Sequence, residues 1–168
     1  MTDVTQFPGY DPTQKPEHTL RIEREFDAPR ELLYRAFVDA DQLAAWFGPE
    51  GWHVPRESID MDVRVGGHQT FSMGPVGGKP EEFNAMTAHF DEVVENELLA
   101  GSEDVEGIPG FEGVSRFSLR LEFHDLGGGR SKLVVEQGPY TEFMTGMAGQ
   151  GWGSSFTKLD AVLAAATA

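Results

Sequence analysis

Hydrophobic and polar positions along this chain follow two different periods, and the changes between them divide the sequence into segments. The stretch TLRIEREF alternates, with Leu20, Ile22 and Phe26 on one face and mainly charged side chains on the other. Alternation of this kind predicts a β-strand with one buried face.

Two short helices are expected directly after this strand. Asp27 and Pro29 mark the start of the first helix, because proline favours the first helical turn. Asp39, with Gln42 three residues later, fits a capping box for the second helix. The Gly-Pro pair that follows Phe47 ends that helix.

From residue 52 to about residue 138 the hydrophobic period is two. The clearest strand is SRFSLRLEFHDL, in which every second residue is apolar. The stretch WHVPRESIDMDVRV is also predicted to be a strand, with one face formed by Ile59, Met61, Val63 and Val65. Glycine-rich turns such as GPVGGKP and LGGGR separate the strands. One-sided strands joined by short turns predict an antiparallel sheet with one solvated face.

The last segment, TEFMTGMAGQGWGSSFTKLDAVLAAATA, returns to helical spacing. Its first half contains glycines at positions 146, 149, 151 and 153. Each such glycine costs about 1 kcal/mol relative to alanine in a helix. The order of elements therefore predicts an α+β fold: a sheet of six to seven strands, two short helices after strand one, and one long C-terminal helix.

The first 17 residues differ from the rest of the chain. Residues 1–17 contain three prolines and no hydrophobic period, so they predict a flexible arm, for which Phe7 and Tyr10 are the candidate surface contacts. Residues 18–168 are expected to form a single domain.

One helix is too narrow to cover such a sheet, because a helix is about 10–12 Å wide and strands lie nearly 5 Å apart. The sheet is therefore expected to curl around the helix and to leave a cavity, which the helix glycines enlarge. The expected lining comprises aromatic and apolar residues of the second helix end, the inner sheet face and the last helix: Trp46, Phe47, Trp52, Phe71, Met73, Met86, Phe117, Leu119, Leu121, Met144, Met147, Trp152 and Phe156.

Arg24 occupies an inner position of the first strand, next to Ile22 and Phe26. An inward arginine must be paired or must reach water. Two interpretations follow: a salt bridge near the strand end, or a polar anchor for a carboxylate or phenolate of a ligand.

Composition narrows the function classes. The net charge is −15, from 28 acidic and 13 basic side chains. Such a surface repels phosphate backbones and anionic lipids, so neither a nucleic acid nor a membrane is an expected partner. The chain has no cysteine, which excludes thiolate chemistry and agrees with a reducing cytoplasmic location.

Motifs for catalysis or metal binding are missing from the sequence. The histidines lack HxxxH or HExxH spacing, and there is no GxSxG elbow. We therefore expect no metal and no cofactor, and no catalytic residue can be assigned. His68 and His89 are expected on the solvated face, where Asp62 is placed to pair with Arg64. Residues 101–113, GSEDVEGIPGFEG, are either a lid over the cavity or a long exposed hairpin, and both readings stay open.

Four short motifs, taken in order, resemble the activator of heat shock protein 90 ATPase homologue-like family. They are FDAP, WFGP, DVRVGG and GW, which start at Phe26, Trp46, Asp62 and Gly151. This family belongs to the START-like SRPBCC superfamily, which has the helix-grip fold of the birch-pollen allergen. The resemblance runs from about residue 18 to the end of the chain. It implies a curved antiparallel sheet that grips a long C-terminal helix around a hydrophobic cavity, with no assigned reaction.

The sequence thus predicts binding of a small apolar or amphipathic molecule between the sheet and the C-terminal helix. Two alternatives stay open: an enzyme similar to a polyketide cyclase, or a chaperone-associated protein-interaction module. The identity of the ligand is not determined by the sequence, nor is the oligomeric state, for which a homodimer remains open.

Overall fold

The computed structural model of the chain describes residues 9–106 and 114–167. Within them, eight strands form one curled antiparallel sheet. In chain order the strands are β1 (His18–Phe26), β2 (Trp52–His53), β3 (Asp60–Asp62), β4 (His68–Pro75), β5 (Asn84–Val94), β6 (Leu98–Glu106), β7 (Val114–Gly127) and β8 (Arg130–Tyr140). Their order across the sheet is β1-β8-β7-β6-β5-β4-β2, and β3 also pairs with β4. The predicted α+β helix-grip architecture is confirmed.

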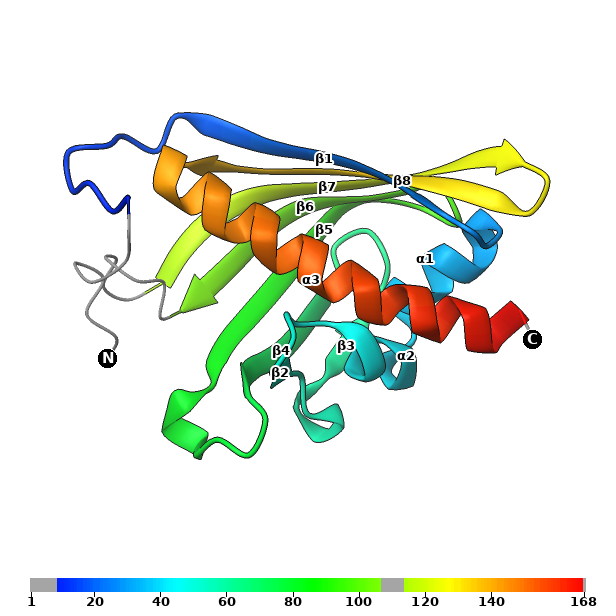
Figure 1. The fold of residues 1–168 in the computed structure, drawn as a ribbon, viewed down its shortest axis with the longest axis horizontal. Coiled ribbons are helices and arrows are strands. Elements are labelled where there is room, and N and C mark those ends of the chain that lie inside the picture. The colour runs from blue at the N-terminus through cyan, green and yellow to red at the C-terminus, as the bar shows by residue number, and fades with distance from the viewer. Residues whose placement is uncertain (1–8, 107–113, 168) are drawn as a thin grey trace.

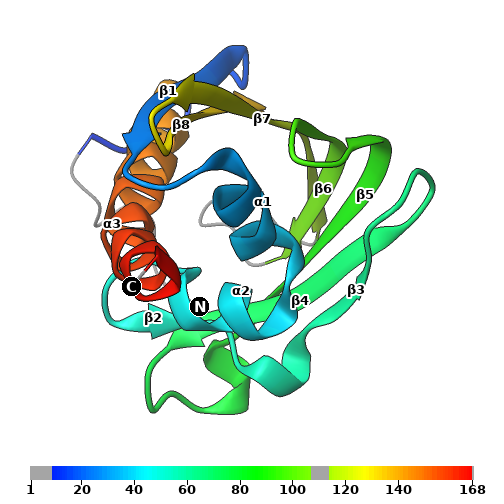
Figure 2. The same ribbon diagram turned by 90° about the vertical axis from the view of Figure 1, so that its right-hand side faces the viewer.

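A long helix, α3 (Glu142–Thr167), lies across the hollow of the sheet (Figure 1). Viewed along the curl, α3 occupies the open side of the ring, between β1 and β2 (Figure 2). The short helices α1 (Arg30–Val38) and α2 (Ala40–Trp46) contact the same helix. They lie near its C-terminal end, so that α3 is the one α-helix of the described residues at the other end of the hollow (Figure 1).

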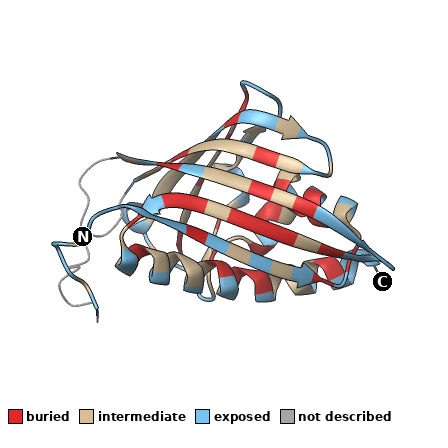
Figure 3. Cartoon of the chain, turned by 90° about the horizontal axis from the view of Figure 1, so that it is seen from above, coloured by how far each residue is buried: buried red, intermediate tan, exposed pale blue. Residues whose placement is uncertain are grey.

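The predicted alternation is present along the strands, where buried and exposed residues follow one another (Figure 3). In β7, Phe117, Leu121 and Phe123 are buried, while Ser118 between them and Arg116 and His124 beside them are exposed. The buried face of each strand points toward α1, α2 and α3, which gives a single apolar interior between sheet and helices.

Two hydrogen bonds and one ring contact fix the short helices α1 and α2 relative to each other. The Asp39 side chain accepts a hydrogen bond from the Gln42 backbone N–H at 3.1 Å, as the capping pattern predicts. The indole Nε1–H of Trp46 donates to the Ala36 carbonyl oxygen at 2.8 Å. Trp46 is fully buried, and its ring packs edge-on against Phe37. This contact fixes α2 on α1.

The prediction of one continuous strand between Trp52 and Val65 is wrong. The stretch is divided into β2, a 3₁₀ turn at Arg56–Ser58 and β3, and Val65 is 61% exposed. Pro55 has no N–H to donate to a strand ladder, so the pairing stops before it. Both short pieces pair with β4, which raises the strand number from the expected six or seven to the eight observed in the described residues.

The described part of the N-terminal arm lies against the first turn of α3. The Tyr10 ring packs edge-on against Phe143, with ring centroids 5.5 Å apart. The side-chain oxygen of Gln14 accepts a hydrogen bond from the Phe143 backbone N–H at 2.9 Å. Tyr10 is therefore a surface contact of the arm, whereas Phe7 lies outside the described residues.

The segment considered as a lid is partly strand. Residues 101–106 form the second half of β6, and residues 107–113 lie outside the described part of the chain. Gly101 stands opposite the irregularity in the β5–β6 pairing between Phe90 and Glu92. A side-chain carbon at Gly101 would lie 1.8 Å from the carbonyl oxygen of His89. This close approach of two backbones requires glycine.

Replacing Gly101 with alanine should destabilise the fold by about 1–3 kcal/mol or more, because the new methyl group meets backbone that cannot move away cheaply. The matched control is Gly153→Ala in α3, where nothing lies within 4 Å of the added carbon. That change should instead stabilise the protein by up to about 1 kcal/mol through helix propensity. Urea unfolding of both variants measures the two effects, and equal unfolding midpoints would contradict the close approach.

Candidate functional site

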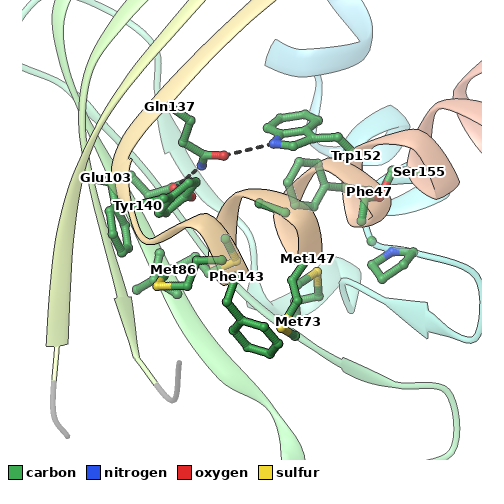
Figure 4. A pocket seen from close by; sticks show the side chains of 17 residues that line it. Phe47, Met73, Met86, Glu103, Gln137, Tyr140, Phe143, Met147, Trp152 and Ser155 are labelled. Carbon is green, nitrogen blue, oxygen red and sulfur yellow. Dashed lines mark hydrogen bonds between the residues drawn. The ribbon is translucent and has the colours of Figure 1, made fainter. Parts of the chain in front are cut away.

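A cavity of about 270 Å³ lies between the N-terminal half of α3 and the concave face of the sheet (Figure 4). Its walls come from the segment after α2, from strands β4 to β8, and from α3. The described residues that line it include the methionines Met73, Met86, Met144 and Met147. Methionine side chains are flexible and polarisable, so they adapt to apolar partners of different shape.

Part of this space is open because α3 carries two small residues over it. Ala148 and Gly151 both line the cavity, and a carbon added at Gly151 would meet nothing within 4 Å. Larger side chains of the same helix half also line the cavity: Phe143, Met144, Met147 and Trp152. Further along α3, Phe156, Leu159 and Leu163 are buried in the core.

A chain of buried hydrogen bonds forms the polar end of the cavity (Figure 4). The Trp152 indole Nε1–H donates to the side-chain oxygen of Gln137 at 2.9 Å. The Gln137 amide nitrogen in turn donates to Oε1 of Glu103 at 2.5 Å. All three residues are at least nine-tenths buried. An indole nitrogen can only donate, so Trp152 fixes which way the Gln137 amide points.

The carboxyl group of Glu103 is held in an unusual environment. Burial raises the pKa of Glu103 to about 7. The hydrogen bond from Gln137 acts in the opposite direction and lowers the pKa, and the charge of Asp104 raises it by a smaller amount. Tyr140, which also lines the cavity, has its pKa raised by burial and by the charge of Glu103. Tyr140 therefore keeps its proton at neutral pH, and Glu103 favours its neutral form below about pH 7.

The neighbouring acid, Asp104, has the opposite character because successive residues of a strand point to opposite faces. It lies on the solvated face and accepts hydrogen bonds from Arg116 at 2.6 and 2.8 Å. His89 lies 3.2 Å from the same carboxyl group. The Arg116 hydrogen bond lowers the pKa of Asp104 to about 2, so this residue stays ionised.

The structure brings together part of the predicted cavity lining. The predicted residues that line the cavity are Phe47, Met73, Met86, Phe117, Met144, Met147 and Trp152. The remaining ones lie elsewhere in the core or beside it: Trp46, Trp52, Phe71, Leu119, Leu121 and Phe156. Trp52 lies in β2, where its carbonyl oxygen accepts a hydrogen bond from Lys158 at 3.0 Å.

Arg24 is engaged away from the cavity. Its two terminal nitrogens donate to the two carboxylate oxygens of Asp160 on α3, each at 2.6 Å. The guanidinium carbon also lies 4.6 Å from the centre of the Phe26 ring. Of the two interpretations drawn from the sequence, the salt bridge is the one that forms, and it ties α3 to the edge strand β1.

Three polar residues of the site were missed in the sequence: Glu103, Gln137 and Tyr140. The signal for Glu103 is present, since Leu99, Gly101, Glu103 and Val105 share one face of β6. An acid at an inner position of a one-sided strand is unusual. It was overlooked because residues 101–113 were interpreted as a loop.

The outer face carries the exposed ion pairs. His68 and His89 lie there, as expected, next to Asp60 and Asp104, and Arg64 binds Asp62 at 2.7 Å. Within the described residues, no group of three His, Cys, Asp or Glu side chains is arranged to hold a metal ion. No helix in this part of the chain is long and apolar enough to cross a membrane.

Comparison with known proteins agrees with this geometry. Residues 27–164 match the family model described as Activator of Hsp90 ATPase homolog 1-like protein. The chain belongs to this family. The family resemblance inferred from the four motifs is thus confirmed, and the matched region includes all of the cavity lining.

Solved structures of the same type are similar to this chain over most of its length. The AHSA1 protein from Silicibacter pomeroyi is 26% identical, with a TM-score of 0.73 over 88% of this chain and 98% of that chain. A protein from Chromobacterium violaceum is 24% identical, with a TM-score of 0.72 over 87% of this chain and 97% of that chain. Because its sequence identity is below 25%, the likeness to the Chromobacterium violaceum protein shows the fold alone. No match is found among curated proteins.

The raised pKa of Glu103 has a consequence for stability. Between pH 4.5, the usual pKa of a glutamic acid, and about pH 7, the folded protein keeps a proton that the unfolded chain has released. Stability contributed by this group is therefore lost as the pH rises through this window, by up to about 3 kcal/mol. Glu103→Gln, which cannot ionise, should be more stable than the wild-type protein at pH 8 and closer to it at pH 4.5.

Urea unfolding at a series of pH values measures this difference. The control is Glu106→Gln, which removes the same charge from an exposed position of the same strand. A constant difference between Glu103→Gln and the wild-type protein across the pH range would show that Glu103 titrates normally.

Proposed function

We propose that this protein binds a small hydrophobic or amphipathic molecule in the cavity between α3 and the sheet. The observation that carries the proposal is the cavity itself: about 270 Å³ of space with a mainly apolar lining and one polar cluster. Sites for small molecules are typically concave and apolar, with a few placed polar groups that orient the ligand. The volume favours a compact ligand, such as one with two fused or linked rings, over a long lipid chain.

The packing around the cavity supports a preformed site. Phe47 contacts the rings of Phe71 and Trp152, with centroid separations of 5.1 and 5.7 Å. Phe117 packs edge-on against Tyr140 with the ring centroids 4.7 Å apart. Aromatic side chains that are already packed against their neighbours lose little conformational entropy when a ligand binds. More of the free energy gained by burying the ligand therefore contributes to its affinity.

An enzyme similar to a polyketide cyclase is the second candidate, and Glu103 is the observation in its favour. A carboxyl group with a pKa near 7 in a cavity is able to give or take a proton near neutral pH. Tyr140 lies beside it as a further proton-carrying group. Turnover of a bound substrate that is lost in Glu103→Gln, with binding retained, would favour this candidate over simple binding.

The binding proposal is tested with N-phenyl-1-naphthylamine, a neutral probe that fluoresces in apolar sites. The wild-type protein should enhance its fluorescence at a stoichiometry of one. Ala148→Phe places a ring in the cavity wall and should weaken binding about tenfold or more, because the ring occupies the space that the probe needs.

The matched control is Ala164→Phe, which adds the same ring at an exposed position of the same helix. This variant should bind the probe like the wild-type protein. Circular dichroism checks that both variants fold. Equal probe binding by the two variants, or no binding by the folded wild-type protein, would contradict the proposal.

A further inference from the structure

We infer that the polar end of the cavity receives a carbonyl oxygen, that of a ketone or aldehyde, between two hydrogen-bond donors: the neutral carboxyl group of Glu103 and the hydroxyl group of Tyr140. This inference rests on the proposed binding function and specifies its ligand class. The two side chains lie together at the sheet end of the cavity (Figure 4), close enough for the charge of one to act on the other.

The position of the Glu103 proton follows from the hydrogen-bond chain. Trp152 can only donate, so the Gln137 oxygen accepts from it and the Gln137 nitrogen must donate to Oε1 of Glu103. Oε1 is therefore an acceptor in this chain. When Glu103 is neutral, its proton sits on the other oxygen, Oε2, which becomes a donor.

Both donors have room for a ligand. Within residues 9–106 and 114–167, the Glu103 carboxyl group takes part in one hydrogen bond, the one from Gln137. The Tyr140 hydroxyl takes part in none within the same residues. In the same part of the chain, the one fully enclosed side-chain polar atom without a partner is Nε of Arg30. Oε2 of Glu103 and the Tyr140 hydroxyl are thus not sealed off, and both residues line the cavity.

The surroundings favour the neutral carboxyl group over the ionised one. Of the described residues that line the cavity, only Glu103 and Tyr140 can ionise, and the lining residues from β4, β5, β7 and α3 are all uncharged. The charge that acts on the pKa of Glu103 is that of Asp104, on the opposite face of β6 with Arg116 and His89. A buried acid with no cation facing it keeps its proton and donates.

These two donors select a particular ligand chemistry. A carbonyl oxygen has two lone pairs and can accept from both groups at once. A ligand carboxylate would place a negative charge in a cavity whose described lining holds no cation. An ammonium group would require Glu103 to ionise inside an apolar cavity, at a desolvation cost. A neutral carbonyl compound with an apolar ring system meets neither penalty.

The test uses three probes that share one ring system: 2-acetylnaphthalene, 2-ethylnaphthalene and 1-(2-naphthyl)ethylamine. Calorimetric titration at pH 5.5 should show the ketone binding about tenfold or more tightly than the hydrocarbon, since each net hydrogen bond contributes roughly a factor of five. Above about pH 7 the ketone affinity should fall, as Glu103 loses the proton that it donates. The hydrocarbon affinity should stay constant.

Two variants separate the donors. Glu103→Gln keeps an N–H donor at this position while its oxygen accepts from Gln137, so it should keep the ketone preference and lose the pH dependence. Tyr140→Phe keeps the ring and removes one donor, so ketone affinity should fall about fivefold at every pH. The exposed Glu106→Gln serves as the control and should behave like the wild-type protein.

The failures are distinguishable. Equal binding of the ketone and the hydrocarbon would overturn this inference and leave the proposed binding function intact. Preference for the amine, with an affinity that rises with pH, would overturn it in favour of an ionised Glu103. Loss of the ketone preference in a folded Glu103→Gln would also overturn it. Binding of none of the three probes would remove the proposed function and the inference with it.

Discussion

One helix has to close the open side of a curled sheet, and the rest of the structure depends on how it does so. The helix is tied to β1 by the pairing of Arg24 with Asp160 and to the segment before β2 by Ser154, whose hydroxyl accepts from the Glu50 N–H at 2.7 Å. These ties hold α3 across the gap. At its C-terminal end, α1 and α2 lie beneath it, whereas no other α-helix of residues 9–106 and 114–167 lies beneath its N-terminal half. The cavity is the space that this asymmetry leaves.

Trp152 joins the apolar and polar parts of the site. Its ring contacts Phe47 and Phe156, which connects the cavity wall to the core. Its N–H orients the Gln137 amide, which in turn orients the Glu103 carboxyl group. The packing of one aromatic ring therefore sets the direction in which a buried proton is presented. A shift of α3 along the sheet would disturb both properties together.

Much of the fold was predictable because it follows from periodicity, which reports which face of a strand or helix is buried. Periodicity does not report what lies opposite that face. Trp46, Phe71 and Phe156 are expected in the cavity, yet they belong to the core, where their rings pack on Phe37 of α1, on Phe47 and on Phe26 of β1 in that order. The predicted methionines do line it: Met73 and Met86 lie on the inner face of the sheet, and Met144 and Met147 lie on the N-terminal half of α3.

The polar end of the site was missed for a different reason. The sequence around Glu103 is rich in glycine and acidic residues, which are depleted in strands, so local preference favours a loop. Pairing with β5 and β7 overrides that preference and places the residue inside. The prediction of one long strand from Trp52 to Val65 is wrong for the opposite reason. The apolar spacing of this stretch favours strand pairing, but Pro55 interrupts it.

The contact between the N-terminal arm and α3 bears on the shape of the cavity. Tyr10 and Gln14 hold Phe143 from outside, and Phe143 is part of the cavity wall. Both arm residues precede residue 27, where the match to the family model begins. One wall of the cavity is thus buttressed by side chains that neither line it nor belong to the matched region.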